Sequence, residues 1–309
     1  MALPDEVKEL AARVRNWGRW GDDDEIGTIN LITDDVVKAV AAEIKTGKRF
    51  SLGIPMDENG PQTGVIEGRE NPVREMIMVD VQIMGDPALF TTSDDKVAMG
   101  IQACTHWDAL AHVSYEGKLY NGVPSSVITE QGASRMGIDK ITTLVSRGVL
   151  LDVARAHGVD EVEGTHAITG EDLDQAGALG KVTVRAGDIV MLRTGRMAKF
   201  LREGRDAYNA VPVSGPSLQS VEWFHDHDVA AVATDNIIFE VYPSEREDAQ
   251  LAVHLLHLVD MGMTQGQNWN LEELAADCAA DGRYTCFLDA SPMPFTGAVG
   301  SPVNPIAIK

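Results

Sequence analysis

Residues 148–195 contain the stretch that decides the fold: "GVLLDVA" (148–154), a predicted helix after Thr169, and "GDIVMLRTG" (187–195). The two short apolar runs are typical of buried strands. Thr169, followed three residues later by Asp172, predicts a capping box at the start of the helix between them. A strand, a helix and another strand in this order favour an α/β fold.

The same alternation continues toward the C-terminus. Further strands are expected at 229–235 and 283–290, and further helices around 218–227, 247–258 and 270–282. We find no low-complexity linker and no repeat of fixed period. The sequence therefore predicts one α/β domain that spans residues 1–309.

The first half of the chain has a different pattern. We expect helices at 7–14 and 33–47, the second capped by Thr33 or Asp34, a loop over 53–74, and strands at 76–84 and 96–104. Both of these strands are mostly apolar, so we expect each to be buried on at least one face.

The charge of the chain excludes some partners. Lysine and arginine number 26 against 47 aspartate and glutamate, which gives a net charge of −21. Such a chain repels nucleic-acid phosphates and anionic lipid headgroups, so we expect a small-molecule substrate and neither nucleic acid nor membrane as a partner. The start of the chain has no apolar leader, and three widely spaced cysteines suit free thiols, so we expect a cytoplasmic protein.

The segment "QACTHWDALAHV" (102–113) contains the residues that can carry chemistry. On an extended strand, Gln102, His106 and Asp108 project from one face, and Asp108 and His112 share a face if the chain turns helical. Two imidazoles and a carboxylate suit one divalent ion, zinc or manganese. His254, in "AVHLLHLVDMG" (252–262), is a candidate distant ligand.

The residues of this segment also permit roles that need no metal. The histidines can be satisfied core residues that flank a helix-capping aspartate. Cys104 can be a soft ligand, a nucleophile with His106 or His112 as its base, or a small buried residue. Asp235 and Glu240 can reach the site from a strand end, or hydrogen-bond to backbone in a structural loop.

The segment resembles the signature H-x-G-T-H-x-D-x-P-x-H of the cyclase-like metal hydrolases, the group of kynurenine formamidase, isatin hydrolase and trans-dienelactone hydrolase. Four positions match and three differ: Thr105, His106, Asp108 and His112 match, whereas Gln102, Cys104 and Leu110 replace histidine, glycine and proline. Segments such as "NWGRWGDDDEIGTINLIT" (16–33) and "HLLHLVDMGM" (254–263) extend the resemblance over most of the chain.

The resemblance implies a compact swivelling β/β/α fold with a barrel-like central sheet, usually in dimers or tetramers. It implies metal ligation by His106 and Asp108, and a role for His112 as a ligand or as the catalytic histidine. The later family histidine corresponds to His254 or His257. The family glutamate that follows it corresponds to Gln267.

Glutamine brings no charge to a cation, so we expect Gln102 to be a weak metal ligand or a neighbour of the ligands, and Gln267 to hold a second ion poorly. We therefore expect one metal ion rather than two. The expected activity is hydrolysis of a C–N or C–O bond at the carbonyl of a cyclic or aryl amide, imide or lactone, in the arylformamidase-like class. His112 would transfer the proton. The alternatives are a hydrolase with Cys104 as nucleophile and a degenerate member that only binds a ligand or a metal.

The substrate pocket is expected to include aromatic side chains. Trp17, Trp20 and Trp107 are candidates for its walls, together with Cys104 and Gln267. Core packing is the alternative for all three tryptophans, and strand alternation favours it for Trp107.

Overall fold

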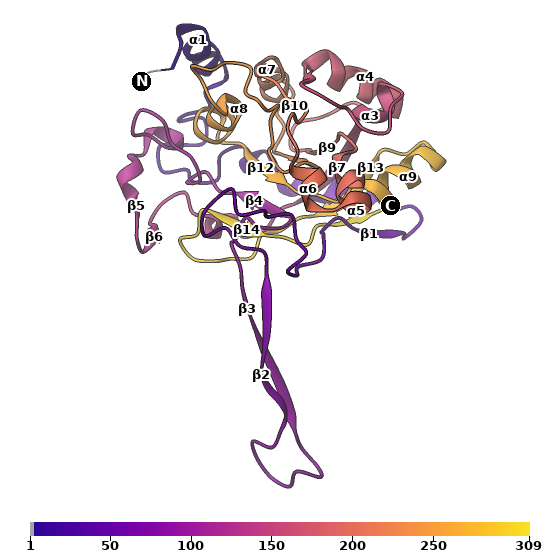
Figure 1. Ribbon diagram of the computed structural model, residues 1–309. Coiled ribbons are helices and arrows are strands. Elements are labelled where there is room, and N and C mark those ends of the chain that lie inside the picture. The colour runs from indigo at the N-terminus through magenta and orange to yellow at the C-terminus, as the bar shows by residue number, and fades with distance from the viewer. Residues whose placement is uncertain (1–2) are drawn as a thin grey trace.

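A computed structural model describes residues 3–309 of the protein. Within these residues, nine strands form one curled sheet that resembles half of a barrel (Figure 1). Their order across the sheet is β1 (Arg49–Ser51), β15 (Ile306–Ile308), β13 (Thr285–Asp289), β7 (Val145–Asp152), β9 (Ile189–Arg193), β11 (Ala231–Thr234), β12 (Thr264–Gln267), β4 (His106–Asp108) and β14 (Gly300–Pro302).

The centre of the sheet is parallel and buried on both faces. Strands β7, β9, β11 and β12 are parallel neighbours, with Val149 opposite Val190 and Val190 opposite Val232. These side chains join one hydrophobic cluster, whereas Leu150, Met191 and their neighbours on the opposite face join another. This two-sided burial explains why the strands are short, nearly continuous apolar runs.

Helices cover both faces of the sheet. Side chains of α1, α4, α7 and α8 pack on one face, where Figure 1 shows these helices together, and α9 packs on the other. The bounds of the helices are α1 (Asp5–Val14), α2 (Asp34–Val40), α3 (Val153–Ala156), α4 (Gly170–Gly180), α5 (Arg196–Glu203), α6 (Arg205–Asn209), α7 (Leu218–Asp226), α8 (Ala252–Leu255) and α9 (Glu272–Asp281). The α/β fold class is therefore confirmed, as is the capping box formed by Thr169 and Asp172.

Short helical turns and small sheets complete the fold. The 3-10 turns are η1 (Gly27–Leu31), η2 (Ala41–Glu43), η3 (Tyr120–Gly122), η4 (Ser125–Val127) and η5 (Ile138–Lys140), and a π-helix, η6 (Leu256–Met261), follows α8. The small sheets pair β5 (Ile128–Thr129) with β6 (Gly132–Ala133), β8 (Ala167–Ile168) with β10 (Gly215–Pro216), and β2 (Val73–Val81) with β3 (Thr92–Ala98).

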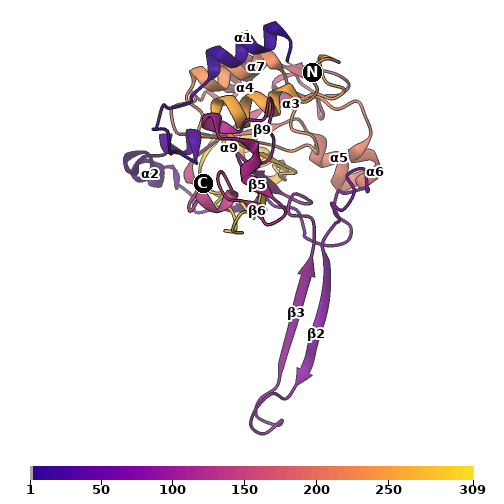
Figure 2. The same ribbon diagram turned by 90° about the vertical axis from the view of Figure 1, so that its left-hand side faces the viewer.

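The expectation for the strands at 76–84 and 96–104 was wrong. The strand expected at 76–84 overlaps β2, but the strand expected at 96–104 shares only residues 96–98 with β3, and residues 99–104 form a loop. β2 and β3 make a hairpin that projects from the body with no residue buried (Figure 2). The apolar side chains of a strand predict that the strand is buried, but they do not show whether the rest of this chain supplies the surface that buries it.

Two predicted helices are shorter than expected. The helix at 33–47 is capped by Thr33 as predicted, but it tightens into the 3-10 turn η2 after Val40. The helix at 247–258 begins only at Ala252, because Leu251 has a left-handed backbone (φ of 50°) that an α-helix does not accommodate. No helix in the described part of the chain is long and apolar enough to cross a membrane.

Candidate metal and substrate site

Strand β4 carries the central candidate residues. It lies between β12 and β14, with His106 opposite Gln267 and Asp108 opposite both Gln265 and Gly300. Because side chains alternate along a strand, His106 and Asp108 point to one face, and Trp107 between them points to the other. Trp107 is fully buried against Trp269 and donates its indole N–H to the carbonyl of Ala290 at 2.8 Å.

Close backbone packing holds this strand in place. Gly266 is opposite Trp107, and a Cβ at Gly266 would lie only 2.9 Å from the indole ring. Only glycine therefore fits there without a shift of the tryptophan. The packing of Trp107 on one face of the strand thus fixes the direction of His106 and Asp108 on the other.

The His106 ring has a defined tautomer. Its Nδ1 lies 2.7 Å from the backbone carbonyl oxygen of Cys104, and since a carbonyl only accepts, Nδ1 must donate. In the neutral ring the lone pair is then on Nε2, which lies 3.5 Å from Oδ1 of Asp108. Both atoms are buried and have no hydrogen-bond partner among the described residues. Two buried acceptors facing each other need a proton or a cation between them.

His112 reaches the same oxygen from a turn. Its Nε2 lies 3.7 Å from Oδ1 of Asp108, and its backbone N–H donates to the carbonyl of Ala109. Burial lowers the pKa of His112 although Asp108 opposes the shift. Burial by itself raises the pKa of Asp108, but the charges of His112 and His106 hold that pKa well below its usual range. We call His106, Asp108 and His112 the pocket cluster.

His254 lies near the pocket cluster, close enough for its charge to affect the pKa values of Asp108 and His112. Glu240 fixes its position: one carboxylate oxygen accepts from His254 Nδ1 at 2.7 Å and from its backbone N–H at 2.8 Å. Burial lowers the pKa of His254, but this hydrogen bond and the charge of Glu240 leave it raised overall. A carboxylate that orients a histidine in this way is a common companion of metal ligands.

Two further candidates from the sequence, His257 and Asp235, have different surroundings. His257, on the π-helix η6, packs edge-on against Phe224 and Phe239, and burial lowers its pKa to about 3. Asp235 accepts hydrogen bonds from Thr194 and from the backbone of Gly195, which gives it a place in a structural loop.

The two glutamines lie beside the pocket cluster. Gln267 Nε2 donates to Oδ2 of Asp108 at 2.7 Å, so the other carboxylate oxygen is the one that faces the histidines. Gln102 lines the same pocket as His106, and its amide packs closely on Gly300. Gln267 therefore orients the aspartate, whereas Gln102 forms part of the pocket wall.

A cavity of about 320 Å³ opens above His106. Its walls are mostly apolar, and its polar atoms come from a few side chains. The lining residues include Val65, Ile66, Arg69, Gln102, His106, Val211, Ile237, Tyr242, Leu251 and Asn268. An apolar cavity with few polar groups suits a small organic ligand.

Arg69 is a pocket residue that sequence reasoning missed, because it lies in the segment 53–74 that the sequence marks only as a loop. Burial lowers the pKa of Arg69, and the negative charge of Asp108 only partly opposes this shift. Within residues 3–309, no carboxylate lies within ion-pair distance of its guanidinium group, although the chain is strongly acidic. Its charge is therefore available to a ligand.

The remaining predicted pocket residues lie elsewhere. Trp17 donates its indole N–H to the carbonyl of Val259 and packs under Arg15, while Trp20 packs under Arg19. Of the described residues that line the cavity, none is a tryptophan. Cys104 is buried with Ile54, and burial raises its pKa to about 11. A thiol with that pKa is almost entirely protonated at neutral pH.

A second group with suitable residue types lies at the start of α4. His157, His166 and Asp172, here the surface cluster, have ligand atoms within 4.8 Å of one another. His157 Nε2 is 2.8 Å from one oxygen of Asp172, and the other oxygen accepts from the backbone N–H and hydroxyl of Thr169. Both histidines are partly exposed.

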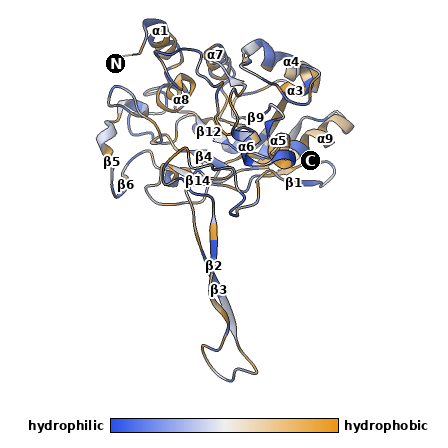
Figure 3. Cartoon of the chain, viewed as in Figure 1, coloured by the Kyte–Doolittle hydropathy of each residue, from blue (hydrophilic) through white to orange (hydrophobic). Residues whose placement is uncertain are grey.

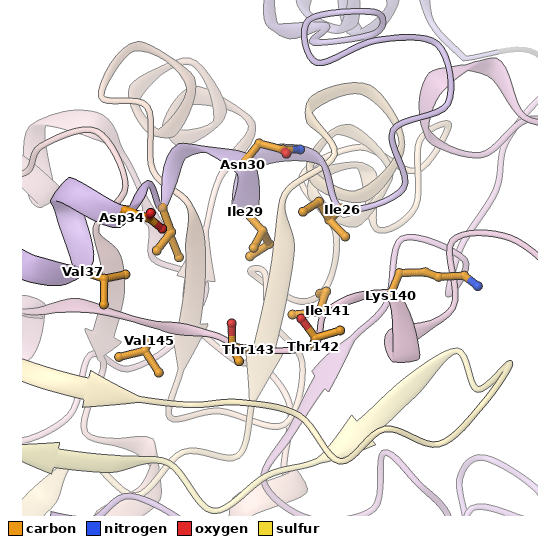
Figure 4. A pocket seen from close by; sticks show the side chains of 11 residues that line it. Ile26, Ile29, Asn30, Asp34, Val37, Lys140, Ile141, Thr142, Thr143 and Val145 are labelled. Carbon is orange, nitrogen blue, oxygen red and sulfur yellow. The ribbon is translucent and has the colours of Figure 1, made fainter.

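A larger surface hollow of about 460 Å³ lies between η1, α2 and the start of β7 (Figure 4). Its lining consists mainly of isoleucine, valine and threonine, with Asp34 and Lys140 as the charged residues. The described residues that line it include no histidine or cysteine. This hollow therefore lacks the chemical groups that the smaller cavity brings together.

Comparison with known proteins points to one family. The Cyclase family model, described as "Putative cyclase", matches residues 36–241. A crystal structure of a novel cyclase is 41% identical, with 96% of this chain and 99% of that chain covered and a TM-score of 0.87. Among curated proteins, none matches this sequence.

Two isatin hydrolases have a similar fold at low identity. Isatin hydrolase A from Ralstonia solanacearum is 19% identical, with 90% of this chain and 98% of that chain covered and a TM-score of 0.64. An isatin hydrolase bound to the product analogue thioisatinate is 15% identical, with 87% and 94% covered and a TM-score of 0.61.

Proposed function

The chain belongs to the cyclase family, and on that premise we propose that it is a metal-dependent hydrolase of a small amide, imide or lactone. The bond cleaved would be the C–N or C–O bond at a carbonyl, as in a cyclic or aryl substrate. One observation carries this proposal: Nε2 of His106 and Oδ1 of Asp108 are buried, 3.5 Å apart and without a partner among the described residues.

These atoms fit a divalent cation, zinc or manganese, with His254 as a candidate further ligand. When bound, such an ion would lower the pKa of a water molecule and polarise a carbonyl. The chain offers one carboxylate to it in Asp108, one oxygen of which is already bonded to Gln267. This donor set favours one ion rather than two.

The protein side chains have separate roles in the proposal. His112, whose lowered pKa keeps it neutral, accepts a proton from the attacking water and returns it to the leaving nitrogen or oxygen. The apolar walls, among them Ile237 and Leu251, exclude bulk water.

Arg69 favours a substrate or product with negative charge. Hydrolysis of a cyclic amide or lactone produces a carboxylate, and an unpaired guanidinium is the protein group best suited to bind one. We therefore propose substrates that carry a carboxylate or develop one on ring opening.

Two other functions are alternatives to a metal-dependent hydrolase. A Cys104 nucleophile is disfavoured by the burial and raised pKa of that thiol. The second alternative is a protein that binds a ligand or a metal without turnover. Gln102 and Gln267 favour it, because they stand at positions where the family has histidine and glutamate. Elemental analysis of the purified protein, with hydrolysis assays on cyclic imides, lactones and formanilides before and after chelation, decides among the three.

The expected result is about one equivalent of zinc or manganese per chain and turnover that chelation abolishes. Turnover that survives chelation and is blocked by iodoacetamide would support the thiol mechanism. Stoichiometric metal without turnover on any substrate would support the binding protein.

A further inference from the structure

Asn268 is a buried residue beside the pocket cluster that the sequence alone does not single out. It directly follows β12, lines the cavity above His106, and is fully buried. Its backbone is left-handed, with a φ of 61°. Glycine adopts this conformation at the lowest cost, and asparagine is one of the few other residues that adopt it. Asparagine in place of glycine here indicates a role for the side-chain amide.

Both ends of the Asn268 amide are hydrogen-bonded. Nδ2 donates to the carbonyl oxygen of Cys104 at 3.1 Å, and Oδ1 accepts from the hydroxyl of Tyr208 at 2.9 Å. The orientation of the amide follows from the first partner, because a carbonyl oxygen only accepts and must face the NH2 end. The backbone is held as well: the N–H donates to the carbonyl of Asn236 at 3.1 Å, and the C=O accepts from the hydroxyl of Thr105 at 2.6 Å.

The carbonyl of Cys104 connects Asn268 with His106. The same oxygen accepts from Nδ1 of His106 at 2.7 Å, so each of its two lone pairs has one donor. Polar residues gather in this part of the sheet, and Figure 3 colours β4 and β12 as hydrophilic. Hydrogen bonds as well as packing therefore fix side-chain directions here. A rotation of the Cys104 peptide group would break both bonds at once.

We propose that Asn268 is a positioning residue for His106: it holds the Cys104 carbonyl in the direction that keeps the proton of the neutral ring on Nδ1. The alternative tautomer has the proton on Nε2, which lies 3.5 Å from Oδ1 of Asp108. That proton would lie between the two buried acceptors and leave no lone pair for a cation. The hydrogen bond from Asn268 disfavours this state. The inference rests on the proposed function, because it assigns the lone pair of Nε2 to a metal ion.

Tyr208 supports the amide from the other side. It lies on α6 and is fully buried, and its hydroxyl is also 3.1 Å from the carbonyl oxygen of Asp235. A hydroxyl has one proton, so it donates to Asn268 or to Asp235 at any moment. Loss of this hydroxyl leaves the bond from Asn268 to Cys104 in place. Tyr208→Phe is therefore expected to have a smaller effect than the loss of the amide itself.

The test compares the wild-type protein with Asn268→Gly, and with Asn16→Ala as the control. Glycine retains the left-handed backbone without strain and removes only the amide. Asn16 is also buried, and its amide donates to the carbonyl of Met261 at 3.0 Å, so the control loses a comparable hydrogen bond away from the cavity. Long-range proton–nitrogen spectra of the histidine rings, recorded on chelator-treated protein at mildly alkaline pH, identify the tautomer of His106. Thermal unfolding checks that each variant is folded.

Wild type and control are expected to have the proton on Nδ1 of His106. Asn268→Gly should show the Nε2–H tautomer, or exchange between the two. Zinc binding, measured by competition with a chelating dye, should weaken by about tenfold or more in Asn268→Gly and by less than about twofold in the control. Tyr208→Phe should lie between them.

A second variant, Asn268→Asp, keeps the test valid if the glycine variant misfolds, because it retains the size of the side chain and replaces the donor with an oxygen. An unchanged Nδ1–H tautomer in a folded variant at position 268 would overturn the proposal, as would an equal change in Asn16→Ala. A wild type that binds no zinc would refute the proposed function instead, and the comparison of tautomers would still decide the role of Asn268.

Discussion

The pocket cluster and the surface cluster each contain two histidines and one aspartate, but their hydrogen bonding differs. In the surface cluster both oxygens of Asp172 already accept hydrogen bonds, from His157 and from Thr169, and the only buried side-chain atom of that cluster without a partner among the described residues is Nε2 of His166. In the pocket cluster Oδ1 of Asp108 and Nε2 of His106 are buried and have no such partner in the part of the chain described. Residue types and spacing alone therefore do not distinguish a capped helix from a candidate cation site.

This difference indicates which of the two clusters would gain free energy from binding a cation. A cation at the surface cluster must displace existing hydrogen bonds and compete with water. A cation at the pocket cluster satisfies atoms whose burial is otherwise costly. We therefore expect the metal to bind in the pocket, and the following substitutions test that comparison.

The largest effect is expected for His106→Ala. Loss of Nε2 removes one of the two orphaned atoms, so bound metal should be lost and kcat/KM should fall by more than about 10³-fold. The matched control is His166→Ala, which removes an imidazole from the surface cluster. Metal analysis and steady-state kinetics on both variants measure the contrast, and loss of metal from His166→Ala alone would reverse the assignment.

The next effect concerns proton transfer. His112→Ala should keep its metal but lose turnover by about 10²-fold or more. Because burial lowers the pKa of His112, the neutral, proton-accepting form persists to lower pH than for an exposed histidine. The wild-type rate should therefore fall on the acid side only below the ordinary histidine range. Loss of metal from His112→Ala would make this residue a ligand instead.

A smaller effect is expected for Arg69→Gln. The unpaired guanidinium makes charge-assisted hydrogen bonds to an anionic substrate, so its loss should raise KM for a carboxylated substrate by about tenfold or more. A neutral analogue of the same substrate serves as the control, and its KM should hardly change. Equal effects on both substrates would contradict a role in charge recognition.

The smallest effect belongs to the surface cluster. Asp172→Asn should reduce stability by about 1 kcal/mol through the weakened capping box, with metal content and turnover unchanged. Burial raises the pKa of Asp172, but hydrogen bonds from Thr169 and His157 and the charge of His166 lower it overall. The carboxylate therefore stabilises the fold above its unfolded-state pKa, and this contribution disappears as pH falls through the lower folded-state value. Thermal unfolding of both proteins across acidic pH measures the difference.

The sequence predicted the parts of the molecule that local patterns determine. The buried strands β7 and β9 were predicted from their short apolar runs, and the capping box from Thr169 with Asp172. Alternation along β4 also predicted the opposite directions of Trp107 and its neighbours. Patterns of this kind need no knowledge of distant residues.

Other features depend on contacts that the sequence does not reveal. The exposure of the hairpin formed by β2 and β3 follows from the absence of a covering surface within the described chain, and apolar strands give no sign of that. Arg69 is notable because no carboxylate among the described residues lies within ion-pair distance of its guanidinium group, and the loop sequence cannot show this. Gln267 meets Asp108 because β12 and β4 are neighbours in the sheet, a pairing between residues far apart in the chain.

The position of β4 between β12 and β14 has a consequence for synthesis on the ribosome. Its two neighbours in the sheet come from residues 264–267 and 300–302, long after residues 106–108 have left the exit tunnel. Until those late segments emerge, the histidine and aspartate of β4 have neither strand to pair with. The centre of the enzyme is thus among the last parts of the nascent chain to take shape, and a prematurely terminated product would lack it altogether.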